Sequence, residues 1–217
     1  MKVLAIYGSP RGKKSQTHAL ADVMLAEVRA GGADVEVVDL GKARIGFCQA
    51  CEACHKGPDC VLNDDGQLIL RKMLAADGVV LASPVYLDHV TAQMKALLDR
   101  TSHFVHCLRF TGKYLAAVTT SGGGGGAATM AFLKRYAVTV GGQFVGGVDA
   151  RVPLTDADYA VSRNLGAALV AAITARQTWP DQVQAIEAQR KRFGQIVAFR
   201  KDEWPYEYAY WQDLKWL

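Results

Sequence analysis

The sequence has no apolar stretch near the roughly eighteen residues needed to cross a bilayer, so we expect no membrane-spanning helix. It also lacks a charged N-terminal segment followed by an apolar core, and its start, MKVLAIYG, is typical of a buried strand rather than of a secretory signal. We therefore expect a cytoplasmic protein. Neither sign of charge dominates, because the net charge is +4 over 217 residues and the basic residues at 190–201 fit a helical face in water. No nucleic-acid partner is predicted.

Cysteine is scarce outside one short segment. Four of the five cysteines fall within thirteen residues, in CQACEACHKGPDC, and they are Cys48, Cys51, Cys54 and Cys60. Cysteines clustered in a reducing compartment usually bind a metal or carry out redox chemistry, and four thiolates complete the ligand set of a zinc ion or of a [4Fe–4S] cluster. Disulfides are a weaker alternative, because cysteines three residues apart in a tight loop rarely reach the required Cα separation and torsion.

The spacing of these cysteines, C-x2-C-x2-C-x5-C, discriminates between the two kinds of metal site. Structural zinc sites commonly pair two C-x2-C units across a longer gap, whereas an unbroken repeat of three resembles the cysteine run of bacterial ferredoxins. We predict one [4Fe–4S] cluster held by all four cysteines in a loop over residues 45–62, with zinc as the alternative. His55 is predicted to be a solvated loop residue, and Cys107 a small buried apolar residue.

The composition, 21% charged and 50% hydrophobic, is ordinary for a globular protein, and the whole chain, residues 1–217, is predicted to form one domain. Apolar runs predict strands over Val3–Tyr7, Val35–Leu40, Gly78–Ser83, Lys113–Thr120 and Gln143–Asp149. Amphipathic segments predict helices over Gln16–Ala30, Asp65–Ala76, Val90–Arg100, Ala127–Val138, Asp156–Ala175 and Asp181–Phe199. This alternation predicts an α/β fold with a doubly wound, five-stranded parallel sheet in the flavodoxin-like order 2-1-3-4-5.

Such sheets bind ligands outside the carboxyl ends of their strands, and three loops expected there have an unusual composition. GSPRGKKSQT at 8–17 places hydroxyls and a guanidinium before a helix, which favours a phosphate site, with an ordinary strand-to-helix turn as the alternative. A Walker motif is absent, which argues against a nucleoside triphosphatase. SPVYLD at 83–88 offers apolar or stacking contacts, and backbone N–H groups of TSGGGGGA at 120–127 suit a flat ring that carries carbonyl oxygens.

Three segments together resemble the iron–sulfur flavoproteins, a group within the NADPH-dependent FMN reductase branch of the flavodoxin-like superfamily. They are GSPR-x3-SQT at 8–17, the cysteine array followed by two aspartates at 64–65, and SPVY-x3-VTAQMKALLDR at 83–100, so the match covers about the first 150 residues. The resemblance implies that the FMN phosphate is held by Ser9, Arg11, Ser15, Gln16 and Thr17. It implies that the isoalloxazine ring is bordered by Pro84, Val85, Tyr86, Leu87, Ser121, Gly122, Gly123 and Gly124. The four clustered cysteines would carry the [4Fe–4S] cluster.

The resemblance also implies an activity. An oxidoreductase of this kind passes electrons from a low-potential donor, either a ferredoxin-type protein or NAD(P)H, through cluster and flavin to a small-molecule acceptor. Because the cofactors supply the chemistry, no catalytic side chain is nominated. Members of the family are oligomeric, so a homodimer or homotetramer is expected, with the cluster of one subunit near the flavin of another. The alternatives are an NAD(P)H-dependent FMN or quinone reductase without a cluster, a non-enzymatic electron carrier, and a zinc-stabilised interaction module.

The C-terminal part, residues 177–217, is predicted to consist of a helix and an aromatic tail. The tail reads EWPYEYAYWQDLKWL, and aromatic residues of this kind are enriched at protein interfaces. Two interpretations stay open for it: contact with another subunit, or folding back onto its own subunit.

Overall fold

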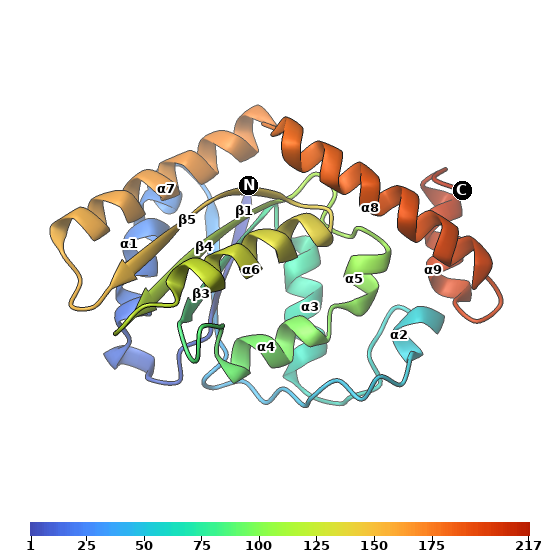
Figure 1. The fold of residues 1–217 in the computed structure, drawn as a ribbon, viewed down its shortest axis with the longest axis horizontal. Helices are drawn as coiled ribbons and strands as arrows, with labels where there is room; N and C mark the ends of the chain where they lie inside the picture. The colour runs from blue at the N-terminus through green and yellow to red at the C-terminus, as the bar shows by residue number, and fades with distance from the viewer.

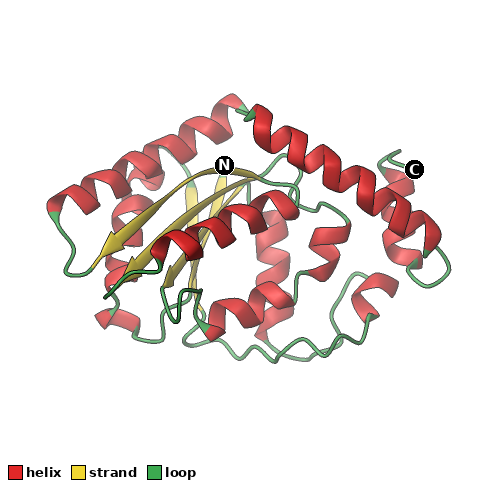
Figure 2. Cartoon of the chain, viewed as in Figure 1, coloured by secondary structure: helices red, strands yellow, loops and turns green.

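The computed structural model describes residues 1–217, which form one parallel sheet with helices on both faces (Figures 1 and 2). The strands are β1 (Lys2–Tyr7), β2 (Asp34–Asp39), β3 (Gly78–Pro84), β4 (Tyr114–Ser121) and β5 (Gln143–Arg151). Their order in the sheet is β2-β1-β3-β4-β5, and every neighbouring pair is parallel. The predicted fold and strand order are confirmed, and each strand begins and ends within two residues of its expected limits.

The helices include the six that were predicted and three short ones that were not. The predicted helices are α1 (Gln16–Ala30), α3 (Asp65–Ala75), α4 (Ala92–Asp99), α6 (Gly126–Thr139), α7 (Asp156–Ala175) and α8 (Pro180–Phe199). The additional ones are α2 (Ala53–Lys56), α5 (Ser102–His106) and α9 (Pro205–Asp213), and a 3-10 turn, η1, covers Gly12–Lys14. No helix is long and apolar enough to span a membrane.

Each face of the sheet contributes to its own apolar core. On one face, the strands pack against α1 and α7, with Leu20, Met24 and Leu169 fully buried. On the other face, they pack against α3, α4, α5 and α6, with Met73 and Met94 fully buried. The central strands are buried on both sides, as their continuous apolar sequences predict. This packing fixes the carboxyl ends of β1, β3 and β4, from which the three unusual loops leave.

The C-terminal helices form a third, smaller core at the side of the domain (Figure 1). Helix α8 leads away from the sheet, and the chain turns back so that α9 packs on α8 and α2 and is hydrogen-bonded to α5 through His106. Trp204 and Trp211 are buried there with Phe193, Val197 and Cys107. The aromatic tail therefore folds back onto its own subunit, and Cys107 is a buried apolar residue as predicted.

The contact between α1 and α7 depends on a glycine that allows close approach. A Cβ atom at Gly166 would lie 2.4 Å from the Met24 carbonyl oxygen and 2.9 Å from Glu27 Cβ. We expect Gly166→Ala to destabilise the protein by about 1–3 kcal/mol, because moving two packed helices apart outweighs the gain in helix propensity of about 1 kcal/mol. Urea unfolding would measure the loss. The exposed Asn164→Ala on the same helix is the control, and equal unfolding midpoints for both variants would contradict this account.

Candidate functional site: two pockets joined by a helix

A cleft of about 220 Å³ lies at the carboxyl edge of the sheet and brings the loops after β1, β3 and β4 together. It is lined by Ser9, Arg11, Ser15, Gln16, Thr17, Pro84, Val85, Tyr86, Thr120, Ser121, Gly122 and Val152. Ten of the residues implied by the resemblance thus meet in one place. Leu87, Gly123 and Gly124 are not among the lining residues, and Leu87 is fully exposed. Thr120 and Val152 were missed, although Thr120 ends the predicted fourth strand.

The N-terminus of α1 forms one end of this cleft. Ser15 caps the helix, with its Oγ accepting a hydrogen bond from the His18 N–H at 3.2 Å. The N–H groups of Gln16 and Thr17 then face no acceptor within the helix, as is general for the first residues of a helix. Together with the positive end of the helix dipole and the nearby Arg11, they form a site whose chemistry fits a phosphate group.

The hydroxyl groups below this helix end are held in place by the sheet. Thr17 Oγ1 and Thr120 Oγ1 are 2.6 Å apart and hydrogen-bonded, which ties α1 to the end of β4. Ser9 is almost completely buried, and its Oγ accepts from the Arg11 N–H at 3.3 Å. A Cβ atom placed at Gly122 would meet no atom within 4 Å, so the backbone of this loop is open to a ligand. The cleft is smaller than the roughly 300–1,000 Å³ of most ligand pockets, and it would enclose only part of a nucleotide-sized molecule.

A second pocket, of about 340 Å³, is lined by all four clustered cysteines. Cys48 and Cys51 are exposed, Cys54 and Cys60 are half-buried, and none is in a disulfide. The backbone N–H of Cys60 donates to Gln67 Oε1 at 2.8 Å, which fixes this end of the loop on α3. The four thiols predicted to share one metal site therefore surround one space.

The same pocket has a buried cation in its wall. Arg100, at the C-terminal end of α4, donates through Nη1 to Asp64 Oδ2 at 2.8 Å and to the Gly46 carbonyl oxygen at 3.1 Å. Burial alone would lower the pKa of Arg100, but the hydrogen bond to Asp64 and the neighbouring charge of Cys60 raise it. The guanidinium is thus a permanent positive charge beside the cysteines. Its place there suits an anionic group, such as a thiolate-ligated metal cluster.

No three of the four thiols have sulfur atoms that all lie within 4.8 Å of one another. Burial, followed by the negative charges of Glu207 and Cys60, raises the pKa of Cys54 to about 11, so metal binding here would release a proton. A tetrahedral zinc site places its sulfur atoms about 3.8 Å apart. The group of three ligand-type side chains whose donor atoms all lie within 4.8 Å is a different one and contains no cysteine.

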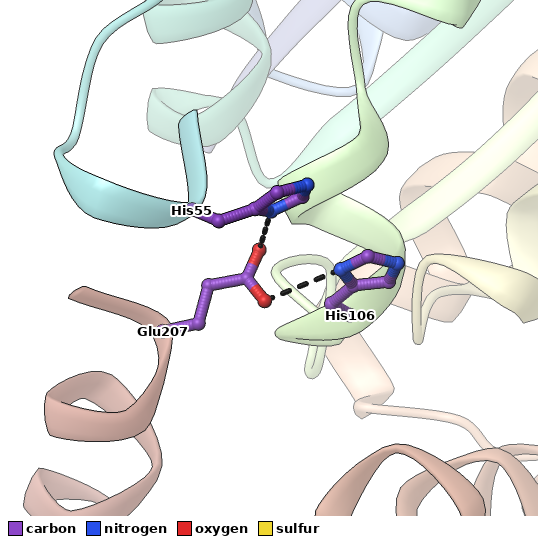
Figure 3. Close-up of side chains that lie close together, drawn as sticks. All are labelled: His55, His106 and Glu207. Carbon is purple, nitrogen blue, oxygen red and sulfur yellow. Dashed lines mark hydrogen bonds and ion pairs between the residues drawn. The ribbon is translucent and has the colours of Figure 1, made fainter. Parts of the chain in front are cut away.

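That other group corrects the prediction made for His55 (Figure 3). His55 is not a solvated loop residue: it lies in α2 and is 5% exposed. Its Nδ1–H donates to Glu207 Oε1 at 2.6 Å, and the Nδ1–H of His106 donates to Glu207 Oε2 at 3.2 Å. No local pattern in the sequence indicates this contact, because Glu207 is 152 residues away from His55 in the chain.

Helix α4 joins the two pockets. At its start, Thr91 Oγ1–H donates to the Gly8 carbonyl oxygen at 2.6 Å, and the Thr91 N–H donates to Ser83 Oγ at 3.0 Å. Gly8 and Ser83 belong to the loops that form the cleft at the sheet edge. At its end, Arg100 lines the cysteine pocket. Two larger hollows lie elsewhere on the surface, but neither contains a clustered cysteine or one of these loops.

Comparison with known proteins identifies the family and the fold. Residues 1–153 match the family model described as NADPH-dependent FMN reductase. The chain belongs to this family. An iron–sulfur flavoprotein of Archaeoglobus fulgidus is 28% identical over 215 residues, which are 94% of this chain and 97% of that protein. A second iron–sulfur flavoprotein of the same organism is 42% identical over 101 residues, which are 46% of this chain and 49% of that protein.

Solved structures of the same fold include an archaeal flavodoxin. It superposes with a TM-score of 0.58 at 16% identity, over 80% of this chain and 99% of that one. Membership of the NADPH-dependent FMN reductase family makes the chain a flavin-dependent oxidoreductase, and the predicted resemblance to the iron–sulfur flavoproteins is confirmed by its relatives. This chain covers almost the full length of the first of these relatives, but only about half of the length of five other iron–sulfur flavoproteins that it matches.

Proposed function

We propose that this protein binds FMN in the cleft at the sheet edge and a [4Fe–4S] cluster in the cysteine pocket, and that it transfers electrons from a low-potential donor to a small acceptor. The observation that carries the proposal is the presence, in one subunit, of four cysteines around one pocket and of a phosphate-type helix N-terminus in a separate cleft. The relatives that are named iron–sulfur flavoproteins support the same pair of cofactors.

Each site uses residues of the chain for binding rather than for proton transfer. In the cleft, the N–H groups of Gln16 and Thr17 and the side chains of Ser9, Arg11 and Ser15 would hold the phosphate. The loops at 84–86 and 121–122 would lie along the ring. In the other pocket, Cys48, Cys51, Cys54 and Cys60 would ligate the iron, and Arg100 would offset part of the negative charge of the cluster.

The two cofactors would supply complementary redox chemistry, because a flavin exchanges one or two electrons and an iron–sulfur cluster exchanges one at a time. A ferredoxin-type protein or NAD(P)H is the proposed donor. The half-exposed Tyr86 and the exposed Leu87 leave the ring side of the cleft open, so a small acceptor could approach there, or a second subunit could cover it. We also propose that the protein forms a homodimer or a homotetramer, in which a second subunit would cover this open side of the cleft.

Metal and flavin analysis of the anaerobically purified protein tests this proposal. We expect about four iron, about four acid-labile sulfide and about one FMN per chain, with a broad visible absorption and, after reduction, the EPR signal of a [4Fe–4S] cluster. One zinc per chain and no sulfide would show that the cysteine pocket holds a zinc ion and not a cluster. FMN reduced rapidly by NADPH in protein without iron would instead favour an FMN or quinone reductase that needs no cluster.

A further inference from the structure

Glu207, on the C-terminal helix α9, is the one carboxylate in the chain that is completely buried. Its two oxygens accept hydrogen bonds from two different histidines, His55 on α2 and His106 on α5 (Figure 3). Burial alone would raise the pKa of Glu207, but these two hydrogen bonds lower it below its usual value. The side chain is therefore held as a carboxylate where an unpaired charge would be costly.

The three side chains are also fixed by an aromatic residue of the same C-terminal segment. The Trp204 ring lies 4.5 Å from the His55 ring and 4.7 Å from the His106 ring, measured between centroids. The neighbouring Trp211 donates its Nε1–H to the His106 carbonyl oxygen at 3.2 Å. Since a buried hydrogen bond to a charged group and flanking aromatic contacts restrict rotation, His55 has little freedom to move.

This contact lies directly beside the cysteine pocket. His55 follows Cys54 in the sequence, and His55, His106 and Trp204 all line the pocket. Helix α2 has only four residues, too few to be stable alone, and it packs on α5 and α9. The Glu207 carboxylate is hydrogen-bonded to both of these histidines, so its charge lies directly behind this wall of the pocket.

A metal ion is the other occupant that this group would suit by spacing, because its three donor atoms lie within 4.8 Å of one another. The hydrogen bonds favour a structural role instead, in which Glu207 anchors the two histidines. Each imidazole N–H already has a carboxylate oxygen as its acceptor, at 2.6 and 3.2 Å, so both oxygens are satisfied without a cation.

We propose that Glu207 is a positioning residue of the cysteine pocket: it holds α2 in place through His55, and its buried charge makes the cluster in that pocket harder to reduce. Only the second part of this inference, the effect on the reduction of the cluster, rests on the proposed function. A nearby negative charge disfavours the addition of an electron, and reduction potentials of such clusters depend on the net charge and hydrogen bonds around them. The C-terminal helix thus sets a property of a site that is about 150 residues away in sequence.

Glu207→Gln tests both halves in the anaerobically purified holoprotein. Hydrogen exchange followed by mass spectrometry should show faster exchange of the peptide that covers residues 48–60, by on the order of tenfold, because a hydrogen bond to a charged group is weakened. An EPR-monitored redox titration should show a higher reduction potential of the cluster. Glu203→Gln is the control, because Glu203 is exposed on the same segment and pairs with Arg200 at the surface.

A second background separates action through His55 from a general loss of stability. His55→Phe keeps an aromatic ring beside Trp204 but removes the donor to Glu207. In that background, Glu207→Gln should cause no further increase in exchange at 48–60, since the contact is already lost. An additive increase would overturn the positioning role, and so would unchanged exchange or an unchanged potential in the single Glu207→Gln variant.

Metal analysis of the same samples keeps the two proposals apart. A metal held by this group would be found in the wild type as zinc, or as iron beyond that of the cluster, at one atom per chain. If such a metal is lost in Glu207→Gln, the group of Glu207 and the two histidines is a metal site, and the positioning role is overturned. A wild-type protein that contains no iron and sulfide would refute the proposed cluster. The exchange measurements would still decide whether Glu207 holds α2.

Discussion

Replacing Cys51 with alanine is expected to reduce the iron and sulfide content from about four to less than one per chain while about one FMN per chain remains bound. Cys51 is exposed, so its truncation leaves no cavity in the core and the fold should persist. The cleft at the sheet edge, which we propose to bind FMN, is built from other loops, and none of its lining residues belongs to the cysteine segment. Iron and sulfide analysis and the visible flavin spectrum measure the two contents in one preparation.

Cys107→Ala is the matched control for this result. Cys107 is a buried cysteine outside the array, in the small core with Trp204 and Trp211. Its truncation should lower stability by about 1 kcal/mol through a small cavity and leave the iron content unchanged. If Cys51→Ala retains a full cluster, Cys51 is not one of its ligands. Parallel loss of FMN would show that the two sites are not independent.

Replacing Gln16 with glutamate is expected to weaken FMN binding on the order of a hundredfold without destabilising the protein. Gln16 is exposed, is the first residue of α1 and lines the cleft. A carboxylate there would repel the phosphate. The same charge at a helix N-terminus stabilises the helix by about 0.3–1 kcal/mol. Affinity and stability should therefore change in opposite directions, which a fluorescence titration of the deflavinated protein with FMN and a thermal melt of that protein would measure.

The neutral variant Gln16→Met separates the charge from the loss of the amide. It should bind FMN within severalfold of the wild type, because the backbone N–H groups and the helix dipole at this end of α1 are unchanged. FMN binding by Gln16→Glu at the wild-type affinity would place the phosphate elsewhere and would contradict the assignment of the 8–17 loop.

The parts of the fold that could be predicted are those that depend on local patterns. The apolar runs at Val3–Tyr7 and Gly78–Ser83 indicate strands buried on both faces, and both are central strands of the sheet. The strand order then brings the loops at 8–17, 83–88 and 120–127 to one edge. For this reason, the loops that form the cleft could be predicted without knowledge of any side-chain contact, whereas its individual residues were implied by the resemblance.

The parts that could not be predicted depend on partners distant in sequence. Helix α2 is too short for a periodic pattern, and it is held by α9, which lies about 150 residues later in the chain. His55 was interpreted as solvated because a histidine in a polar loop usually is, and only the fold places Glu207 against it. The resemblance implied that Leu87 borders the isoalloxazine ring, but its backbone adopts a left-handed conformation (φ +49°) and its side chain is fully exposed.

Helix α4 also limits how the sequence can vary in length. Its eight residues span about 12 Å, and a helix turns by about 100° per residue. If Thr91 stays bonded to Gly8, one inserted residue would rotate Arg100 away from Asp64 and from the cysteines. Among homologues, insertions and deletions are therefore expected in the segments before and after the cysteine array, and between Pro84 and Thr91, while the number of residues from Thr91 to Arg100 stays constant.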